Sequence, residues 1–258
     1  MMFSQLRLTV PDITAVTQFY RDILGMTDQR DGLGYGGQQV YLEFIQGSAQ
    51  PPTADGFFWK IGITVPNLDT VAMHLRRSGV SISQPRQFED IGYMAHCLDL
   101  AGATVEVLQQ GPKGSEPAIE AGHPVANGAI LAHVTLRVRD LAAAQIWCAD
   151  QGMHLISVQP LDAYGFTLYF YAYTQEKAPD ASLTAVANRP WLWRCPYTLL
   201  EFQHLHGAGP RPAASGHLVG LDARDTQSTG SISLPLAGLN VYRSCRSLVI
   251  NGATLETV

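Results

Sequence analysis

The chain repeats one short strand-like pattern three times and carries a weaker fourth copy. The first three copies open on a polar residue, continue with alternating apolar residues and end at Asp or Asn. The fourth is a weaker match, because Val219 and Leu221 share the face of His217. The copies are residues 5–12, 60–67, 133–140 and 217–224. Alternation places successive side chains on opposite faces of a strand. The repeat therefore predicts a chain built from copies of one sheet-forming unit.

A helix is expected after each of the first three strands. Each strand ends at a residue whose short side-chain oxygen can accept hydrogen bonds from the free amides of a first helical turn. Apolar residues follow at helical spacing, and then a glycine that can end the helix. The capping residues are Asp12, Asn67 and Asp140, and the glycines are Gly25, Gly79 and Gly152.

Each unit closes with a strand in which one acid stands among apolar residues. These acids are Glu43, Glu106, Glu201 and Glu256. The second and fourth units also share the sequence Gly-Ala-Thr-x-Glu, at 102–106 and 252–256, which is hard to produce without duplication. We therefore predict an α+β fold of four βαβββ modules with curved mixed sheets.

Links rich in Pro, Gly and Ala separate the modules, and the longest runs from 111 to 128. A boundary placed there predicts two domains, each made of two consecutive modules. The first domain is 1–112, with modules 1–50 and 56–110. The second is 126–258, with modules 126–206 and 213–258.

Composition excludes several classes of partner. The net charge is −5 and the isoelectric point is near 5.9, which gives no electrostatic reason to expect nucleic acid or an anionic membrane. No apolar run reaches the roughly 20 residues of a membrane span, and no signal peptide is evident. The four cysteines lie far apart, as expected for thiols in a reducing cytoplasm.

The opening residue and the closing acid of each module form the candidate site. In the second half they are His133, Glu201, His217 and Glu256, and in the first half Gln5, Glu43, Lys60 and Glu106. Two imidazoles and two carboxylates in one cavity suit a divalent ion such as Zn, Ni, Co, Mn or Fe(II). A lysine ammonium would repel a cation and pair with the acids instead. We therefore expect the metal site in the second domain and a metal-free first domain.

A structural role for each histidine stands beside this hypothesis, because a lone histidine on a strand is more often structural than a ligand. An acid inside an apolar strand is harder to explain without a partner. The remaining histidines are interpreted as structural, with His204 and His206 as reserve ligand candidates near Glu201.

Most of the chain resembles the glyoxalase/bleomycin-resistance/extradiol dioxygenase (vicinal oxygen chelate) superfamily, as a tandem glyoxalase I-like protein. Residues 133–207 resemble the first half of glyoxalase I, through 133–140, 166–173 and 197–204, and residues 57–108 resemble its second half. The resemblance implies a metal-dependent lyase or isomerase acting on a small, glutathione-linked substrate. It also implies roles for single residues: His133, Glu201, His217 and Glu256 as metal ligands, Glu256 and Glu201 as catalytic bases, and Arg137 as a substrate-binding residue.

Other functions remain open on the sequence. Bleomycin-resistance members sequester a flat ligand in a metal-free groove, which Trp59, Trp191 and Trp193 could line here. Extradiol dioxygenases share the four-module plan and use iron(II), but they need no acid at the position of Glu201. A role in assembly without any ligand is a further alternative. The sequence is compatible with a monomer or a homodimer.

Overall fold

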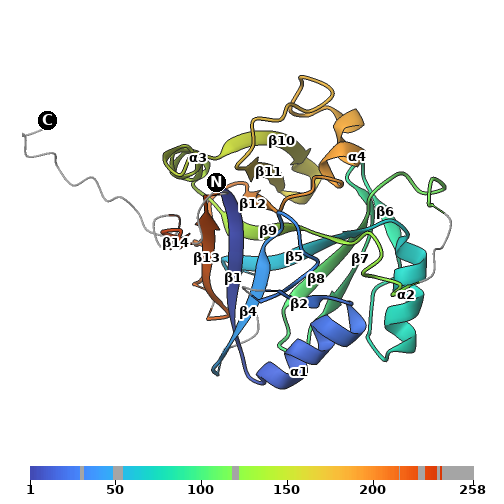
Figure 1. The fold of residues 1–258 in the computed structure, drawn as a ribbon. Helices are drawn as coiled ribbons and strands as arrows, with labels where there is room; N and C mark the ends of the chain where they lie inside the picture. The colour runs from blue at the N-terminus through green and yellow to red at the C-terminus, as the bar shows by residue number, and fades with distance from the viewer. Residues whose placement is uncertain are drawn as a thin grey trace, which may run out of the picture.

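The computed structural model describes residues 1–29, 32–48, 55–117, 122–214, 216–225, 230–236 and 239. The described strands form two mixed sheets, and Figure 1 shows them side by side, with α1, α2 and α3 at the periphery. One sheet has the strand order β14-β13-β1-β4-β3-β2, and the other has the order β10-β11-β12-β9-β5-β8-β7-β6. This is the α+β architecture that the sequence predicts.

The elements have the following bounds. The strands of the six-stranded sheet are β1 (Met2–Val10), β2 (Thr27–Gln29), β3 (Gly32–Gly34), β4 (Tyr41–Gln46), β13 (Leu218–Arg224) and β14 (Ser231–Ser233). Those of the eight-stranded sheet are β5 (Phe58–Val65), β6 (Arg86–Phe88), β7 (Gly92–Leu98), β8 (Thr104–Gln109), β9 (Ile130–Val138), β10 (His154–Leu161), β11 (Phe166–Ala172) and β12 (Leu199–Leu205). The helices are α1 (Ile13–Gln18) with its π-helical continuation η1 (Phe19–Ile23), α2 (Leu68–Arg77), α3 (Leu141–Asp150), α4 (Arg189–Leu192) and the 3-10 turns η2 (Asp162–Tyr164) and η3 (Val186–Asn188).

The predicted caps and stops are present in the first three modules. Asp12, Asn67 and Asp140 each accept a hydrogen bond from the backbone amide three residues later. The glycines that follow the helices have positive φ angles of 70°, 82° and 77°, a conformation that glycine adopts without steric cost. Local sequence thus specifies where each module turns from strand to helix and back.

The modules pair differently from the prediction. Strand β5 of the second module lies antiparallel to β9 of the third, and β1 of the first lies antiparallel to β13 of the fourth. In each of the first three modules, the opening strand uses one edge for the closing strand of its own module, as β5 does with β8. Its other edge accepts the opening strand of another module. Because all opening strands share the same alternation, the pattern does not specify which two will meet, and the expected pairing of consecutive modules is wrong.

The two faces of the eight-stranded sheet have different environments. The face that carries Ile61, Val105, Val134 and Leu200 is buried in the main hydrophobic core, which also contains residues of α2 and β1. The opposite face carries the polar residues of the same strands, and a smaller apolar cluster around Phe170 lies next to them. The candidate site is therefore on the face turned away from the main core.

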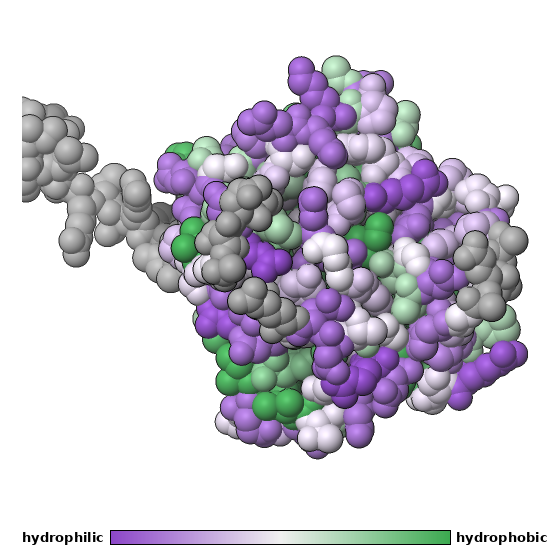
Figure 2. Space-filling view, viewed as in Figure 1, coloured by the Kyte–Doolittle hydropathy of each residue, from purple (hydrophilic) through white to green (hydrophobic). Residues whose placement is uncertain are grey.

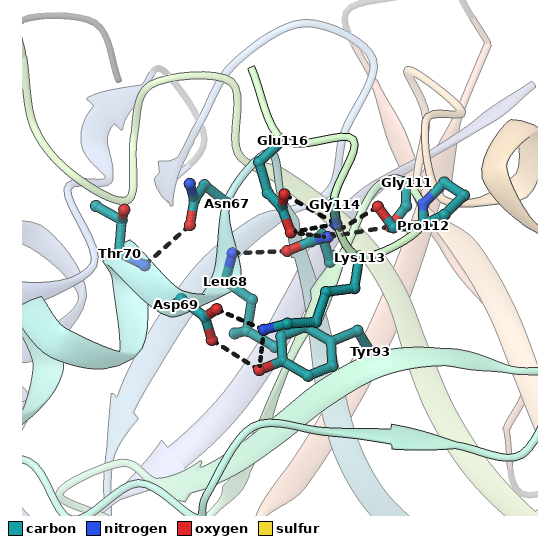
Figure 3. A network of polar contacts seen from close by, with 11 residues as sticks. Asn67, Leu68, Asp69, Thr70, Tyr93, Gly111, Pro112, Lys113, Gly114 and Glu116 are labelled. Carbon is teal, nitrogen blue, oxygen red and sulfur yellow. Dashed lines mark hydrogen bonds and ion pairs between the residues drawn. The ribbon is translucent and has the colours of Figure 1, made fainter. Parts of the chain in front are cut away.

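The segment after β8 is tied to the start of α2 (Figure 3). Lys113 Nζ lies 2.6 Å from Asp69 Oδ2 and donates to the Tyr93 hydroxyl at 2.8 Å. Gln109 Oε1 accepts from the Leu68 amide at 3.2 Å. These contacts hold the start of the long link beside its own module, from which the chain continues into β9.

The surface in Figure 2 is mostly hydrophilic, with hydrophobic residues gathered near the lower ends of β1 and β4. Within the described residues, no helix is long and apolar enough to cross a membrane. Cys97, Cys148 and Cys195 are buried free thiols, while Cys245 lies outside the described residues.

Candidate functional site

The polar face of the eight-stranded sheet borders a cavity of about 570 Å³. Its walls are mainly apolar and aromatic. They include Phe88, Ile91, Met94, Leu161, Tyr164, Phe166, Leu168 and Trp193. Its floor is formed by four charged or titratable residues from the four central strands: Lys60 of β5, Glu106 of β8, His133 of β9 and Glu201 of β12.

The floor residues form one cluster. Lys60 Nζ lies 2.5 Å from Glu106 Oε2 and 3.9 Å from Glu201 Oε2. His133 Nε2 lies 3.2 Å from Glu106 Oε1 and 3.3 Å from Glu201 Oε2. His96 Nε2, from β7, lies 2.9 Å from Glu106 Oε2. The cluster thus joins residues of the second and third modules across the β5–β9 seam.

Burial makes these contacts strong. The side chains of Lys60, Glu106, His133 and Glu201 are each at most 5% exposed. Burial opposes ionisation of Glu106, but the Lys60 ammonium and the neighbouring His133 and His96 imidazoles hold the pKa of this carboxyl well below its usual range. Glu201 accepts a hydrogen bond of 2.5 Å from the Thr135 hydroxyl. A buried carboxylate requires such partners, because an unpaired charge is costly in a low dielectric.

The imidazole of His133 is the least satisfied polar group of the floor. Although two carboxylates lie near Nε2, neither ring nitrogen has a well-aligned hydrogen-bond partner within the described residues. The ring lies against the backbone of Gly62, where an added Cβ would be 2.0 Å from ring atoms. The Trp193 ring lies 6.0 Å from the imidazole, measured between ring centroids. His133 is therefore held in position by packing and retains hydrogen-bonding capacity toward the cavity.

Trp59 links the floor to Arg137. Lys60 Nζ lies 4.4 Å from the Trp59 ring centroid, and the Arg137 guanidinium carbon lies 4.7 Å from it. Arg137 also donates to Gln203 Oε1 at 2.8 Å and to the Gly56 carbonyl at 3.1 Å. Burial lowers the pKa of Arg137 to about 10. Trp59 and Gln203 line the cavity, whereas Arg137 lines a separate hollow of about 350 Å³ with Arg139 and Arg211.

Two turns meet beside the cavity. The Tyr164 hydroxyl, in the η2 turn between β10 and β11, donates to Glu89 Oε1 at 2.8 Å, and its ring lies 5.0 Å from that of Phe88. Glu89, between β6 and β7, has a φ of 44°. Since Phe88 and Tyr164 both line the cavity, these turns from different modules form one of its edges.

The structure brings together half of the predicted metal-ligand set. His133 and Glu201 lie in the cluster, whereas His217 is fully buried elsewhere, with its ring stacked 5.9 Å from that of Phe58. Phe58 belongs to the main core, and His217 does not line the cavity. Glu256 lies outside the described residues. Glu201 is the one predicted catalytic base placed in the cavity.

The strand register explains the position of His217. Gly62 lies opposite both His133 and Glu106 in the eight-stranded sheet. In the six-stranded sheet, Arg7 lies opposite both Gly220 and Glu43. The structural equivalent of His133 is therefore Gly220, three residues after His217, so the alignment that opened the fourth copy at residue 217 was three residues too early.

Lys60, Glu106 and His96 complete the cluster, and the sequence interpretation did not assign them to it. Lys60 and Glu106 occupy the same repeat positions as His133 and Glu201, so the repeat itself indicated that these four residues are equivalent. Because the modules were paired wrongly, the sequence-based prediction placed Lys60 and Glu106 in one domain and His133 and Glu201 in the other. No sequence signal distinguished His96 from the structural histidines. The expected pairing of the lysine with the acids is confirmed by the 2.5 Å contact between Lys60 and Glu106.

A divalent ion does not fit this cluster as it stands. The Lys60 ammonium lies between the two carboxylates that an ion would need, and a second cation there would be repelled. Within the described part of the chain, no group of three or more His, Cys, Asp or Glu side chains is arranged to hold a metal ion.

Comparisons with known proteins agree with this architecture. Residues 3–107 match the family model of the Glyoxalase/Bleomycin resistance protein/Dioxygenase superfamily. The structure is similar to glyoxalase I from Zea mays, with a TM-score of 0.62 and 17% identity over 85% of this chain and 73% of that one. It is also similar to a putative dioxygenase from Bacillus subtilis, with a TM-score of 0.51 and 14% identity over 86% of this chain and 69% of that one. None of the curated proteins matches the chain in sequence. Residues 3–107 thus match the model of the Glyoxalase/Bleomycin resistance protein/Dioxygenase superfamily, and the described part of the chain has a glyoxalase-like fold.

Proposed function

We propose that this protein binds a small, mainly apolar molecule in the cavity of the eight-stranded sheet, without a resident metal ion. The observation that carries the proposal is the combination of apolar walls with a buried floor in which Lys60 stands between the carboxylates. A volume of about 570 Å³ lies within the roughly 300–1,000 Å³ that small-molecule sites occupy. Such sites are mostly apolar, with a few polar groups that orient the ligand.

His133 supports the proposal as the orienting group. Its ring is 1% exposed, faces the cavity and has no well-aligned hydrogen-bond partner within the described residues. A buried polar group without a partner is costly, so a ligand atom that bonds with the imidazole offsets this cost. Trp193 and Phe166 supply flat surfaces on the cavity wall, which favour an aromatic or otherwise planar ligand.

Binding of Nile red, a neutral flat dye whose emission rises in apolar surroundings, tests the proposal. The parent protein is expected to bind the dye with and without EDTA. Leu168→Trp fills the cavity from its wall, and we expect it to weaken binding by about tenfold or more, or by about 1.4 kcal/mol. Ile146→Trp adds the same side chain at an exposed position of α3 and should bind like the parent. Equal binding by both variants, or none by the parent, would contradict the proposal.

A glyoxalase I-type lyase is the second candidate. The observation that favours it is the close approach of His133 to Glu106 and Glu201, because an imidazole between two carboxylates can move a proton on a bound substrate. In a lyase of this kind, Glu201 or His133 would act as the base. The roles predicted for Arg137, His217 and Glu256 would not be needed in this cavity. An extradiol-dioxygenase-like activity has less support, because iron(II) would compete with Lys60 for the same carboxylates.

Turnover of the hemithioacetal of methylglyoxal and glutathione distinguishes the two candidates. A metal-independent lyase would turn it over after EDTA treatment and lose activity in Glu201→Gln. A binding protein would show dye binding without turnover. Activity that appears only after metal addition would contradict the metal-free proposal.

A further inference from the structure

The floor of the cavity is built on a local pseudo-twofold axis. Glu106 lies opposite Gly62, two residues after Lys60, and Glu201 lies opposite Thr135, two residues after His133. Strands β5 and β9, which carry Lys60 and His133, run antiparallel beside one another. Lys60 and His133 are therefore equivalent residues of two modules, as are the two acids.

Two distances within this set match the spacing of ligands around one ion, although Glu106, His133 and Glu201 are not arranged to hold an ion as they stand beside Lys60. His133 Nε2 lies 3.2 Å from Glu106 Oε1 and 3.3 Å from Glu201 Oε2. Donor atoms that bind one ion at about 2.0–2.2 Å lie about 3 Å apart. The fourth member, Lys60, cannot serve as a ligand, because its ammonium group has no lone pair to donate to a metal ion.

The surroundings of Lys60 hold its amine in this place. Its side chain is 4% exposed, and Nζ contacts Glu106 at 2.5 Å and lies 3.9 Å from Glu201. Lys60 Nζ also lies over the Trp59 ring, 4.4 Å from its centroid, and the π face of an aromatic ring favours a cation. Two carboxylates and an aromatic face therefore surround the end of the Lys60 side chain, and together they favour a cation at this place.

We infer that Lys60 is a built-in cation that fills a latent divalent-metal site formed by Glu106, His133 and Glu201. This inference deepens the proposed function and rests on it for the metal-free state of the cavity. Its consequence is specific: one substitution at position 60 should convert the floor into a site with two imidazoles and two carboxylates, a set that suits divalent ions.

The test compares Lys60→His with Lys60→Gln and Lys60→Met, in protein without a histidine tag. The imidazole and the amide oxygen can each complete the ligand set, whereas Met removes the charge and supplies only a soft thioether. Co²⁺ is the probe, since its visible absorption reports coordination, and bound metal per chain is measured after gel filtration. Circular dichroism with and without Co²⁺ checks the fold of each variant.

We expect one Co²⁺ per chain and a Co²⁺-dependent rise in melting temperature for Lys60→His, with weaker binding by Lys60→Gln. The parent and Lys60→Met should show only the weak background that other histidines give. If Lys60→His folds only when Co²⁺ is present, the inference is also supported, because the ion then replaces the lost ammonium. Adding Glu201→Gln to Lys60→His should abolish binding.

Two outcomes would overturn the inference. One is that neither Lys60→His nor Lys60→Gln binds more Co²⁺ than Lys60→Met, whether or not the variants fold. The other is that the parent itself binds Co²⁺ in a way that depends on Glu106 and Glu201. If the parent does not bind Nile red, the proposed ligand-binding function is contradicted, but Co²⁺ binding by the Lys60 variants is unaffected. The two hypotheses can therefore fail separately.

Discussion

Gly62 and His133 face each other across the seam between β5 and β9, and the imidazole occupies the space where a side chain at position 62 would lie. Both residues come from equivalent strands of different modules. The absence of a side chain at Gly62 on β5 thus makes room for the His133 imidazole on β9. The φ of Gly62 is not in the left-handed region, so its requirement for glycine comes from packing alone.

Gly62→Ala tests this relationship. A Cβ at 2.0 Å from ring atoms must displace His133, and overpacking of this kind costs about 1–3 kcal/mol. We expect a loss of stability in that range, seen in urea unfolding, together with weaker Nile red binding. Gly216→Ala is the matched control, because a Cβ there meets nothing within 4 Å and the φ of this glycine is not positive. Unchanged stability of Gly62→Ala would show that the ring is not fixed by Gly62.

The Lys60–Glu106 pair makes a second prediction. Removing one partner of a buried pair leaves an uncompensated charge and costs about 3–5 kcal/mol, whereas replacing both partners is often nearly neutral. We expect Lys60→Met alone and Glu106→Gln alone to be destabilised by amounts in this range. The double variant should recover most of the loss, and a double-mutant cycle in urea measures the coupling. Additive losses would mean that the 2.5 Å contact contributes little.

His217 predicts a pH dependence that is separate from the cavity. Burial lowers the pKa of this imidazole from 6.5 to about 4. Between these values the unfolded chain binds a proton that the folded chain does not, so stability falls as the pH drops from about 6.5 to about 4. At about 1.36 kcal/mol per pH unit, the loss is at most roughly 3 kcal/mol.

His217→Gln removes this titration and should flatten the stability curve in that pH window, as measured by urea unfolding at several pH values. His154→Gln, at an exposed position, is the control and should leave the curve unchanged. A curve that keeps its slope without His217 would assign the pH dependence to other groups.

The edge formed by Tyr164 and Glu89 predicts an effect on ligand exchange. Tyr164→Phe removes the hydrogen bond between the two turns and keeps the ring beside Phe88. Because an exposed hydrogen bond contributes about 0.5–1.5 kcal/mol, we expect Nile red to dissociate roughly two- to tenfold faster, with little change in melting temperature. Stopped-flow displacement measures this rate, and a dissociation rate equal to that of the parent would contradict a role for this edge.

The sequence predicted the parts of the fold that depend on local chemistry. The caps at Asp12, Asn67 and Asp140 and the alternation around His133 follow from residues close together in the chain. Which strands pair depends on open edges, and these look alike in every module. The sequence therefore predicted the first three βαβββ modules correctly and paired the modules wrongly, while most of the fourth module lies outside the described residues.

The candidate site shows the same limit. The repeat marked Lys60, Glu106, His133 and Glu201 as equivalent positions, but only the contact between β5 and β9 brings them into one cluster. The misplacement of His217 has a different cause. A polar residue at the start of a weak repeat does not fix the register, and a three-residue slip moved the alignment from Gly220 to His217.

The pairing of the first module with the fourth also bears on how the chain is made. Strand β1 leaves the ribosome early, but its neighbour β13 follows much later, since Arg7 and Asp222 are 215 residues apart. At translation rates of about 5–20 residues per second, this delay amounts to roughly 10–40 s. During that time one edge of β1 remains open to wrong partners, while β5 and β9 can already pair. The nascent chain is therefore expected to complete the eight-stranded sheet first and to depend on chaperones until β13 joins β1 in the six-stranded sheet.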